Sequence, residues 1–157
     1  MYPPQTARPS QIEGVDPPTP APLAPSVMVI DDSQTVRTVV EASLTRHGYR
    51  VVAFGDGLAA MGALARGEVT VPNLLLLDIG LPKMDGYEVA RILRSKADFD
   101  RTVLVMLTAH DGVLDRLRGR LVGASAYITK PFKVQQVVEA VRTFIEGAEP
   151  AHGELQR

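Results

Sequence analysis

The hydrophobic positions of the chain fall into two alternating kinds of segment. Five short runs rich in aliphatic and β-branched residues predict buried strands, at residues 27–30, 50–54, 74–78, 102–107 and 125–129. Between and after them, apolar residues recur at helical spacing and predict five helices, at residues 33–47, 58–65, 85–93, 111–122 and 134–145. A turn is expected at residues 98–101.

The third predicted strand is the most apolar part of the chain. Four consecutive leucines, residues 74–77, run directly into Asp78. A run without polar alternation suits a strand that is buried on both faces, as in a parallel sheet. Strands that alternate with helices predict an α/β fold, in which a single parallel sheet is covered by helices on both faces.

The first 25 residues differ in composition from the rest. They hold eight of the twelve prolines, at positions 3, 4, 9, 17, 18, 20, 22 and 25. Such a segment buries too little apolar surface to offset its ordering entropy, so residues 1–25 are expected to form a disordered tail. A proline-rich docking ligand is the alternative. Residues 26–146 form the predicted domain, and residues 147–157 a flexible polar tail.

Composition excludes several classes of function. Hydrophobic residues make up 45% of the chain and charged residues 22%, as in globular proteins. A formal net charge of -1 gives no overall basic excess for a nucleic-acid partner. The absence of cysteine excludes disulfides, thiolate catalysis and cysteine-ligated metal. With no secretion signal and no apolar run of about 18 residues, a cytoplasmic protein without membrane contact is expected.

Polar residues follow four of the five predicted strands. In a parallel sheet the carboxyl ends of all strands lie at one edge, where α/β proteins bind their ligands. The residues placed there are Asp31, Asp32, Asp78, Thr108 and Lys130. Taken singly, each has an ordinary structural role: an aspartate caps a helix, a threonine bonds to backbone and a lysine is solvated. Their coincidence at one edge favours a functional site.

Three carboxylates at one edge repel one another, by on the order of 4 kcal/mol for a pair about 4 Å apart. A bound cation relieves that repulsion, and hard oxygen ligands without histidine or cysteine indicate Mg²⁺ or a similar ion. With a divalent cation and a lysine nearby, a phosphoryl group is favoured. One carboxylate can then attack phosphorus to form an acyl phosphate, with the lysine and threonine contacting its oxygens.

Residues 27–146 resemble the receiver domain of bacterial two-component response regulators. The resemblance covers about three quarters of the chain. It implies a flavodoxin-like fold of three layers, with five βα units and strand order 2-1-3-4-5. The motifs that carry it are Asp31-Asp32, D-x-x-x-P-x-x-D-G from Asp78 to Gly86, Thr108-Ala109 and Lys130-Pro131-Phe132.

The resemblance implies a role for each residue of the site. Asp78 corresponds to the phosphoacceptor, and Asp31 and Asp32 to the acidic pair that binds Mg²⁺, with Asp32 the more direct ligand. The backbone carbonyl of Gly80 is the remaining protein ligand expected for the metal. Thr108 and Lys130 correspond to the residues that contact the phosphoryl group. The Lys130-Pro131 bond is expected to be cis.

The same resemblance implies a switch and positions that tune it. Tyr127 matches an aromatic residue that follows Thr108 inward on phosphorylation, although ordinary packing in its strand is the alternative. The helix before the fifth strand, that strand and the last helix are the expected output surface. Gly80 and His110 match positions that tune phosphate lifetime: Gly80 is expected to leave the acyl phosphate open to water, and His110 to shield it partly.

A narrower resemblance covers DGVLDRLRGRLVGASAY, residues 111–127. The segment is similar to single-domain receivers of type IV pilus twitching-motility systems. Arg116, Arg118 and Arg120 are expected to make this helix basic, either as a solvated face or as a surface that docks an acidic partner. A histidine kinase or phosphotransfer protein and a downstream protein target are the implied partners.

Two other classes of protein share parts of the pattern. A Mg²⁺-dependent phosphohydrolase with an aspartyl-phosphate intermediate is the alternative function. It requires a second aspartate two residues after the nucleophile on the first strand, where this chain has Ser33 or Gln34. A flavin carrier requires a phosphate-binding loop at the same place, where two carboxylates would repel the phosphate. A phosphorylation-controlled switch, rather than an enzyme acting on other substrates, is therefore predicted.

Overall fold

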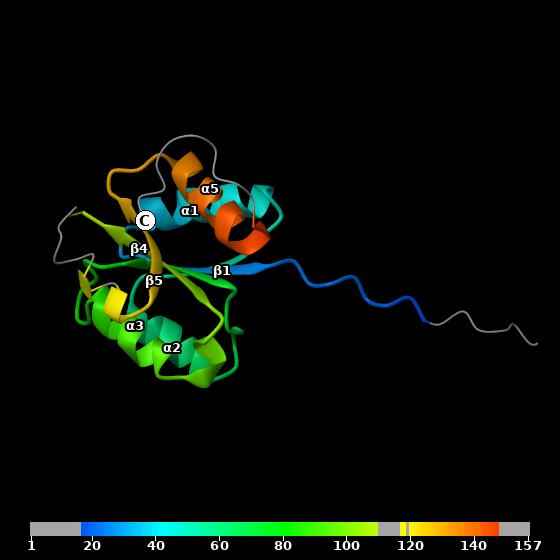
Figure 1. The fold of residues 1–157 in the computed structure, drawn as a ribbon, viewed down its shortest axis with the longest axis horizontal. Coiled ribbons are helices and arrows are strands. Elements are labelled where there is room, and N and C mark those ends of the chain that lie inside the picture. Colours follow the sequence, from blue (N-terminus) through cyan, green and yellow to red (C-terminus); the bar gives the residue numbers. More distant parts are fainter. Residues whose placement is uncertain (1–16, 110–116, 119, 148–157) are drawn as a thin grey trace, which may run out of the picture.

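The computed structural model describes residues 17–109, 117–118 and 120–147. A five-stranded sheet forms the middle of three layers (Figure 1). Its strands are β1 (Ser26–Ile30), β2 (Arg50–Phe54), β3 (Leu74–Asp78), β4 (Val103–Thr108) and β5 (Ala124–Thr129).

Helices cover both faces of the sheet. The helices α1 (Gln34–Arg46) and α5 (Val134–Glu146) lie side by side on one face, and α2 (Gly57–Ala65) and α3 (Gly86–Arg94) lie on the other (Figure 1). The expected turn at 98–101 overlaps the short 3-10 helix η1 (Ala97–Phe99). Of the helix predicted at 111–122, the residues described as helical are 117–118 and 120–121, and residues 110–116 and 119 lie outside the description.

All strand pairs are parallel, in the order β2-β1-β3-β4-β5. This confirms the predicted flavodoxin-like fold. The chain moves outward from β1 to β2 and then crosses back to place β3 on the other side of β1. The carboxyl ends of β1 and β3 therefore flank the point where strand order reverses, which is where open α/β sheets bind ligands.

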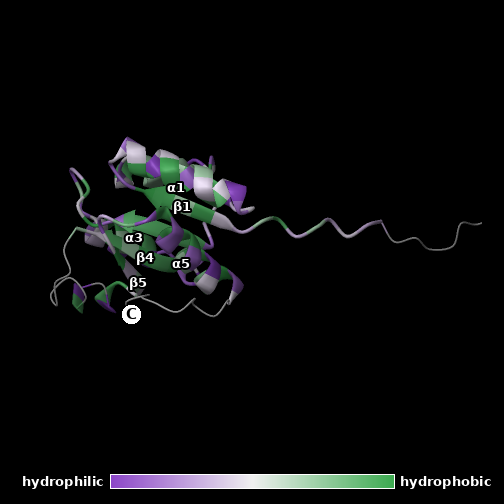
Figure 2. Cartoon of the chain, turned by 90° about the horizontal axis from the view of Figure 1, so that it is seen from above, coloured by the Kyte–Doolittle hydropathy of each residue, from purple (hydrophilic) through white to green (hydrophobic). Residues whose placement is uncertain are grey.

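Side-chain alternation divides the core into two halves. Val27, Val29, Leu74 and Leu76 face α1 and α5, whereas their neighbours along the same strands face α2 and α3. The four leucines of β3 are each at most 2% exposed. A central strand with helices on both sides needs apolar residues at every position, which explains the unbroken leucine run. Figure 2 shows the apolar strands between helices with polar outer faces.

Local signals set the helix boundaries. Ser33, Asp56 and Asp85 accept a hydrogen bond from a backbone N–H in the first turn of α1, α2 and α3, respectively. Gly147 ends α5 in a left-handed conformation with φ of 67°. The Asp56 cap places the start of α2 at Gly57, one residue earlier than predicted.

The fourth strand begins one residue later than predicted and includes Thr108. Thr102 does not pair within the sheet as predicted. Its backbone N–H donates a hydrogen bond of 3.0 Å to the Phe99 carbonyl in a turn, and its hydroxyl donates one of 2.8 Å to the Pro72 carbonyl. Residues 17–25 form no regular element and lead away from the sheet in Figure 1. Within the described residues, no helix is long and apolar enough to cross a bilayer.

Candidate phosphoryl-transfer site

Three of the predicted site residues project from the sheet toward the same side. Asp31 continues the alternation of Val27 and Val29, and Asp78 that of Leu74 and Leu76. Lys130 continues the alternation of Ala126 and Ile128 in the same way. Because alternate residues of a strand share a face, all three follow positions that face α1 and α5. Two carboxylates and one ammonium group therefore lie at the carboxyl edge of the sheet, on the side of α1 and α5.

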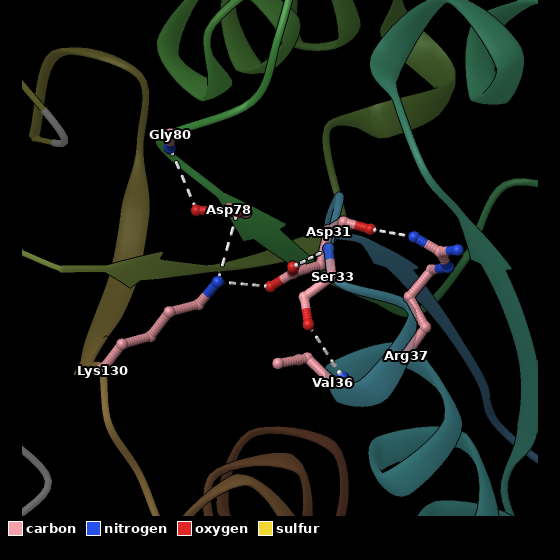
Figure 3. Close-up of polar contacts among 7 residues, drawn as sticks. All are labelled: Asp31, Ser33, Val36, Arg37, Asp78, Gly80 and Lys130. Atoms are coloured by element: carbon pink, nitrogen blue, oxygen red, sulfur yellow. Dashed lines mark hydrogen bonds and ion pairs between the residues drawn. The ribbon is translucent and has the colours of Figure 1, made fainter.

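Lys130 forms ion pairs with both Asp31 and Asp78 and so bridges the two carboxylates (Figure 3). Lys130 Nζ lies 2.6 Å from Asp31 Oδ2 and 3.2 Å from Asp78 Oδ2. Asp31 is fully buried, and Asp78 is 5% exposed. One ammonium therefore holds two buried carboxylates together, and its charge balances only one of them.

Backbone groups orient each carboxylate. Asp31 Oδ1 accepts a hydrogen bond from the Ser33 N–H at 2.9 Å, and Asp78 Oδ1 accepts one from the Gly80 N–H at 3.0 Å (Figure 3). Arg37 Nη1 donates to the Asp31 carbonyl oxygen at 2.7 Å. These bonds fix the two acids at the ends of β1 and β3. Sequence reasoning missed the role of Arg37, whose only signal was its place in the first turn of a helix that follows the acidic pair.

The electrostatic environment shifts two of these groups. Burial raises the pKa of Asp78, and the nearby charge of Asp31 raises it further. The Gly80 hydrogen bond and Lys130 oppose this in part. Burial alone would lower the pKa of Lys130, but its hydrogen bond to Asp31 and the charges of Asp31 and Asp78 outweigh burial and raise it. Lys130 is thus held as a cation beside an excess of carboxylate.

The donor set fits a hard divalent cation. Asp31, Asp32 and Asp78 each offer a carboxylate oxygen, and these atoms all lie within 4.8 Å of one another. Asp32 is exposed whereas the other two acids are buried, so the cluster opens to solvent on the Asp32 side. Oxygen donors and surplus negative charge are what Mg²⁺ prefers. Asp31 and Asp78 also retain the Lys130 contact, which a phosphoryl oxygen can share.

The remaining predicted residues lie along the β4 and β5 ends. Thr108 is 3% exposed at the end of β4, and its carbonyl accepts a hydrogen bond of 2.7 Å from the Lys130 N–H. Thr108 follows Met106 on the α2 and α3 face, and the half-buried Tyr127 pairs with Met106 in the β4–β5 register. Thr108 and Tyr127 therefore share one face of the sheet.

The loops that carry the acids have their own geometry. The Lys130–Pro131 peptide bond is cis. Gly80 is exposed, and an added Cβ there would meet only Asp78 Oδ1, at 3.7 Å. His110, the second predicted rate-tuning residue, lies outside the described residues.

The glycine that ends the β3 motif permits a close backbone approach. A Cβ on Gly86 would lie 2.3 Å from the Asp78 carbonyl oxygen and 2.8 Å from Ile79 Cα. The Gly86 N–H donates to the Ile79 carbonyl at 2.9 Å, which ties the start of α3 to the end of β3. Glycine is thus the residue that lets α3 begin directly beside Asp78. Sequence reasoning used Gly86 only as part of a motif.

Comparison with known proteins identifies this arrangement. Residues 27–142 match the family model of the response regulator receiver domain. The chain belongs to that family. As a receiver domain it acts in phosphorylation-controlled two-component signalling. Receiver domains are signalling switches, generally not classic enzymes.

Individual relatives cover the receiver domain to different extents. Protein PilG of Pseudomonas aeruginosa is 36% identical over 124 residues, which span 79% of this chain and 90% of PilG. Response regulator MprA of Mycobacterium leprae is 37% identical, but this chain spans only 52% of it. The probable transcriptional regulator ycf27 of Porphyridium aerugineum is likewise matched over 50% of its length. Among solved structures, the chemotaxis response regulator CheY4 of Vibrio cholerae superposes with a TM-score of 0.69 at 26% identity, covering 78% of this chain and 99% of CheY4.

Proposed function

We propose that this receiver domain accepts a phosphoryl group on Asp78 from a histidine kinase or a phosphotransfer protein. The observation that carries the proposal is the Asp31–Lys130–Asp78 bridge at the reversal point of the sheet. It supplies a buried nucleophile, a cation for phosphoryl oxygens and a partner carboxylate for metal binding.

The transfer is a displacement at phosphorus. An oxygen of the ionised Asp78 carboxylate forms the new P–O bond, while the bond from phosphorus to the donor breaks and its electron pair leaves with the donor. Lys130, already 3.2 Å from Asp78, moves its contact onto a phosphoryl oxygen, and Thr108 donates its hydroxyl to another. Asp31, Asp32, Asp78 and the Gly80 carbonyl would hold Mg²⁺, which supplies further positive charge to the phosphoryl oxygens.

Phosphorylation then changes the packing of side chains next to the site, and this change alters the output surface. Because Thr108 and Tyr127 share a face of the sheet, inward movement of the Thr108 hydroxyl opens space that Tyr127 can follow. This biases the surface made by β5, α5 and the helix before β5, which binds the downstream protein. In the same proposal, Gly80 leaves the acyl phosphate open to water and His110 shields it partly.

The cellular setting is part of the proposal. The match to 90% of PilG and the arginine-rich segment before β5 support a role in type IV pilus or other motility. We place the protein in the cytoplasm, without direct binding to nucleic acid or membrane.

We propose residues 26–146 as the functional domain, with tails on either side. The carbonyls of Ala24 and Pro25 accept hydrogen bonds of 2.7 and 2.9 Å from Arg50, so we extend the unit to residue 24.

Binding of beryllium fluoride, a mimic of the acyl phosphate, tests the proposed clamp. Fluorine NMR of the full chain with Mg²⁺ should show a bound signal for the wild type, no signal for Asp78→Asn and at least about tenfold weaker binding for Lys130→Met. Lys133→Met is the matched control because Lys133 is an exposed residue at the start of α5. Equal binding by Lys130→Met and Lys133→Met, or a retained signal in Asp78→Asn, would contradict the proposal.

A further inference from the structure

A groove separates α3 from the residues that precede β5. Its volume is about 340 Å³. It is lined by Tyr87, Arg91 and Arg94 of α3, by Ser95 directly after α3, and by Arg118, Leu121 and Val122. In Figure 1 these later residues lie beside α3, on the sheet face opposite α1 and α5. We refer to it as the α3 groove. It is separate from the Asp31–Lys130–Asp78 site at the strand ends.

Three guanidinium groups give the α3 groove its charge. Arg118 lies over the ring of the buried Tyr87, 4.4 Å from the ring centroid, which holds its charge against α3. Arg94 donates to the carbonyls of Phe99, Val122 and Gly123 at 2.7, 3.3 and 3.2 Å. These bonds fix the wall of the groove. Burial lowers the pKa of Arg94, and the nearby charge of Asp100 opposes this in part.

Two of the three arginines, Arg91 and Arg118, have no carboxylate partner among the described residues. Within the part of the chain that the structure describes, no acidic side chain lines the groove. Elsewhere among the described residues, Arg66 pairs with Glu68 at 2.7 Å and Arg142 with Glu146 at 3.8 Å. The α3 groove therefore presents cations that a ligand from outside can pair.

Exposed leucines accompany the groove arginines in the sequence. Leu121 lines the groove and is 83% exposed, and Leu117, next to Arg118 in the sequence, is 55% exposed. Large exposed aliphatic residues beside unpaired arginines are typical of protein interfaces, in which arginine is enriched and lysine depleted. A small anion would use the guanidinium groups but leave the leucines in water.

We propose that the α3 groove docks an acidic, amphipathic segment of a partner protein. Carboxylates of that segment pair with Arg91 and Arg118, and its apolar residues cover Leu117 and Leu121. This surface shares the residues before β5 with the output surface proposed above, but it uses α3 in place of β5 and α5. Docking there does not require Asp78, so the two proposals can fail independently.

A synthetic helical peptide with a leucine stripe flanked by glutamates serves as the probe. Its affinity for the full chain is measured by fluorescence anisotropy, and its position by amide shifts of the isotope-labelled chain. We expect the shifts to centre on α3 and residues 120–123. Arg91→Gln combined with Arg118→Gln should weaken binding about tenfold. The matched control is Arg46→Gln combined with Arg142→Gln, which removes the same charge from α1 and α5 and should leave the affinity unchanged.

Three outcomes would overturn the proposal. An equal loss in both double variants would show attraction to net charge rather than to the groove. Equal binding by a peptide with glutamine in place of glutamate would show that charge pairing is not involved. Displacement of the peptide by pyrophosphate at the same concentration, with the same amide shifts, would assign the groove to small phosphate anions. Asp78→Asn should bind the peptide as the wild type does.

Discussion

The buried carboxylate of Asp78 lowers the stability of the fold, although the proposed function requires it. It lies buried beside a second buried acid, and both share the single ammonium of Lys130. Burial and the charge of Asp31 raise the pKa of Asp78, so its charged form is disfavoured in the folded protein. A residue placed at such a cost is expected at a functional site.

Replacement of Asp78 by asparagine should therefore stabilise the protein at neutral pH. A carboxyl group whose pKa is raised by folding adds stability at low pH and loses it as pH rises through that pKa. With metal removed by EDTA, Asp78→Asn should raise Tm by about 3 °C at pH 7, and the gain should shrink toward pH 4. Asp56→Asn is the control, since both residues cap a helix well. A lower Tm at pH 7 for Asp78→Asn would contradict this reading.

At the scale of single residues, the sequence predicted those site residues that directly follow a predicted strand. Strand alternation, visible in the sequence, places Asp31, Asp78 and Lys130 on one face, and the strand order then brings them together. The hydrogen bonds of Arg37 to Asp31 and of Arg94 to three carbonyls were not visible. They depend on how loops and helix ends pack, and an arginine in a helix has no pattern that distinguishes such a role from solvation.

The junction between β3 and α3 sets the position of Asp78. Gly86→Ala should destabilise the protein by about 2 kcal/mol, because its Cβ would lie 2.3 Å from the rigid Asp78 carbonyl oxygen. Gly80→Ala is the matched control in the same loop: its Cβ would make an ordinary contact of 3.7 Å, and its effect should stay within about 0.5 kcal/mol. Urea unfolding measures both. Equal stability of the two variants would show that the junction relaxes easily.

A second contact joins α5 to the turn before β2. The Tyr49 hydroxyl donates a hydrogen bond of 2.6 Å to Glu146 at the end of α5. Burial, this bond and the charge of Glu146 raise the pKa of Tyr49 from 10.0 to about 12. Because folding raises the pKa, the stabilising effect is complete below pH 10 and is lost as pH rises through 12.

Tyr49→Phe should accordingly cost about 1 kcal/mol of unfolding free energy at pH 8. The difference from the wild type should close as pH approaches 12. Urea titrations at several pH values measure it, with Arg142→Gln, which contacts the same carboxylate at 3.8 Å, expected to change stability by less than about 0.5 kcal/mol. A difference that stays constant up to pH 12 would rule out the Tyr49–Glu146 bond as its source.

At the scale of elements, the order and type of the described strands and helices followed from periodicity, and so did the bounds of β2 and β3, but several other boundaries did not. Asp56 caps α2 and moves its start to Gly57, one residue before the predicted position. Thr102 lies before β4 because its backbone N–H closes a turn with the Phe99 carbonyl. Boundaries of this kind are set by single capping and turn hydrogen bonds, which the spacing of apolar residues does not reveal.

At the scale of the whole molecule, the candidate site lies between β1 and β3, where the strand order reverses. The alternation of strands with helices predicted a parallel sheet, but many strand orders satisfy that pattern. The order β2-β1-β3-β4-β5 came from the family resemblance and is confirmed. The α3 groove could not be predicted, because it is made by the packing of α3 against residues that lie far along the chain.

The central claim is that Asp78 takes up a phosphoryl group in a reaction that needs Mg²⁺ and Lys130. Intact-mass measurement of the full chain incubated with acetyl phosphate tests it most directly. The wild type with Mg²⁺ should gain one phosphate, Lys133→Met should do the same, and Asp78→Asn or chelation of the metal should abolish the gain. A phosphate gain in Asp78→Asn equal to that of the wild type would contradict the account.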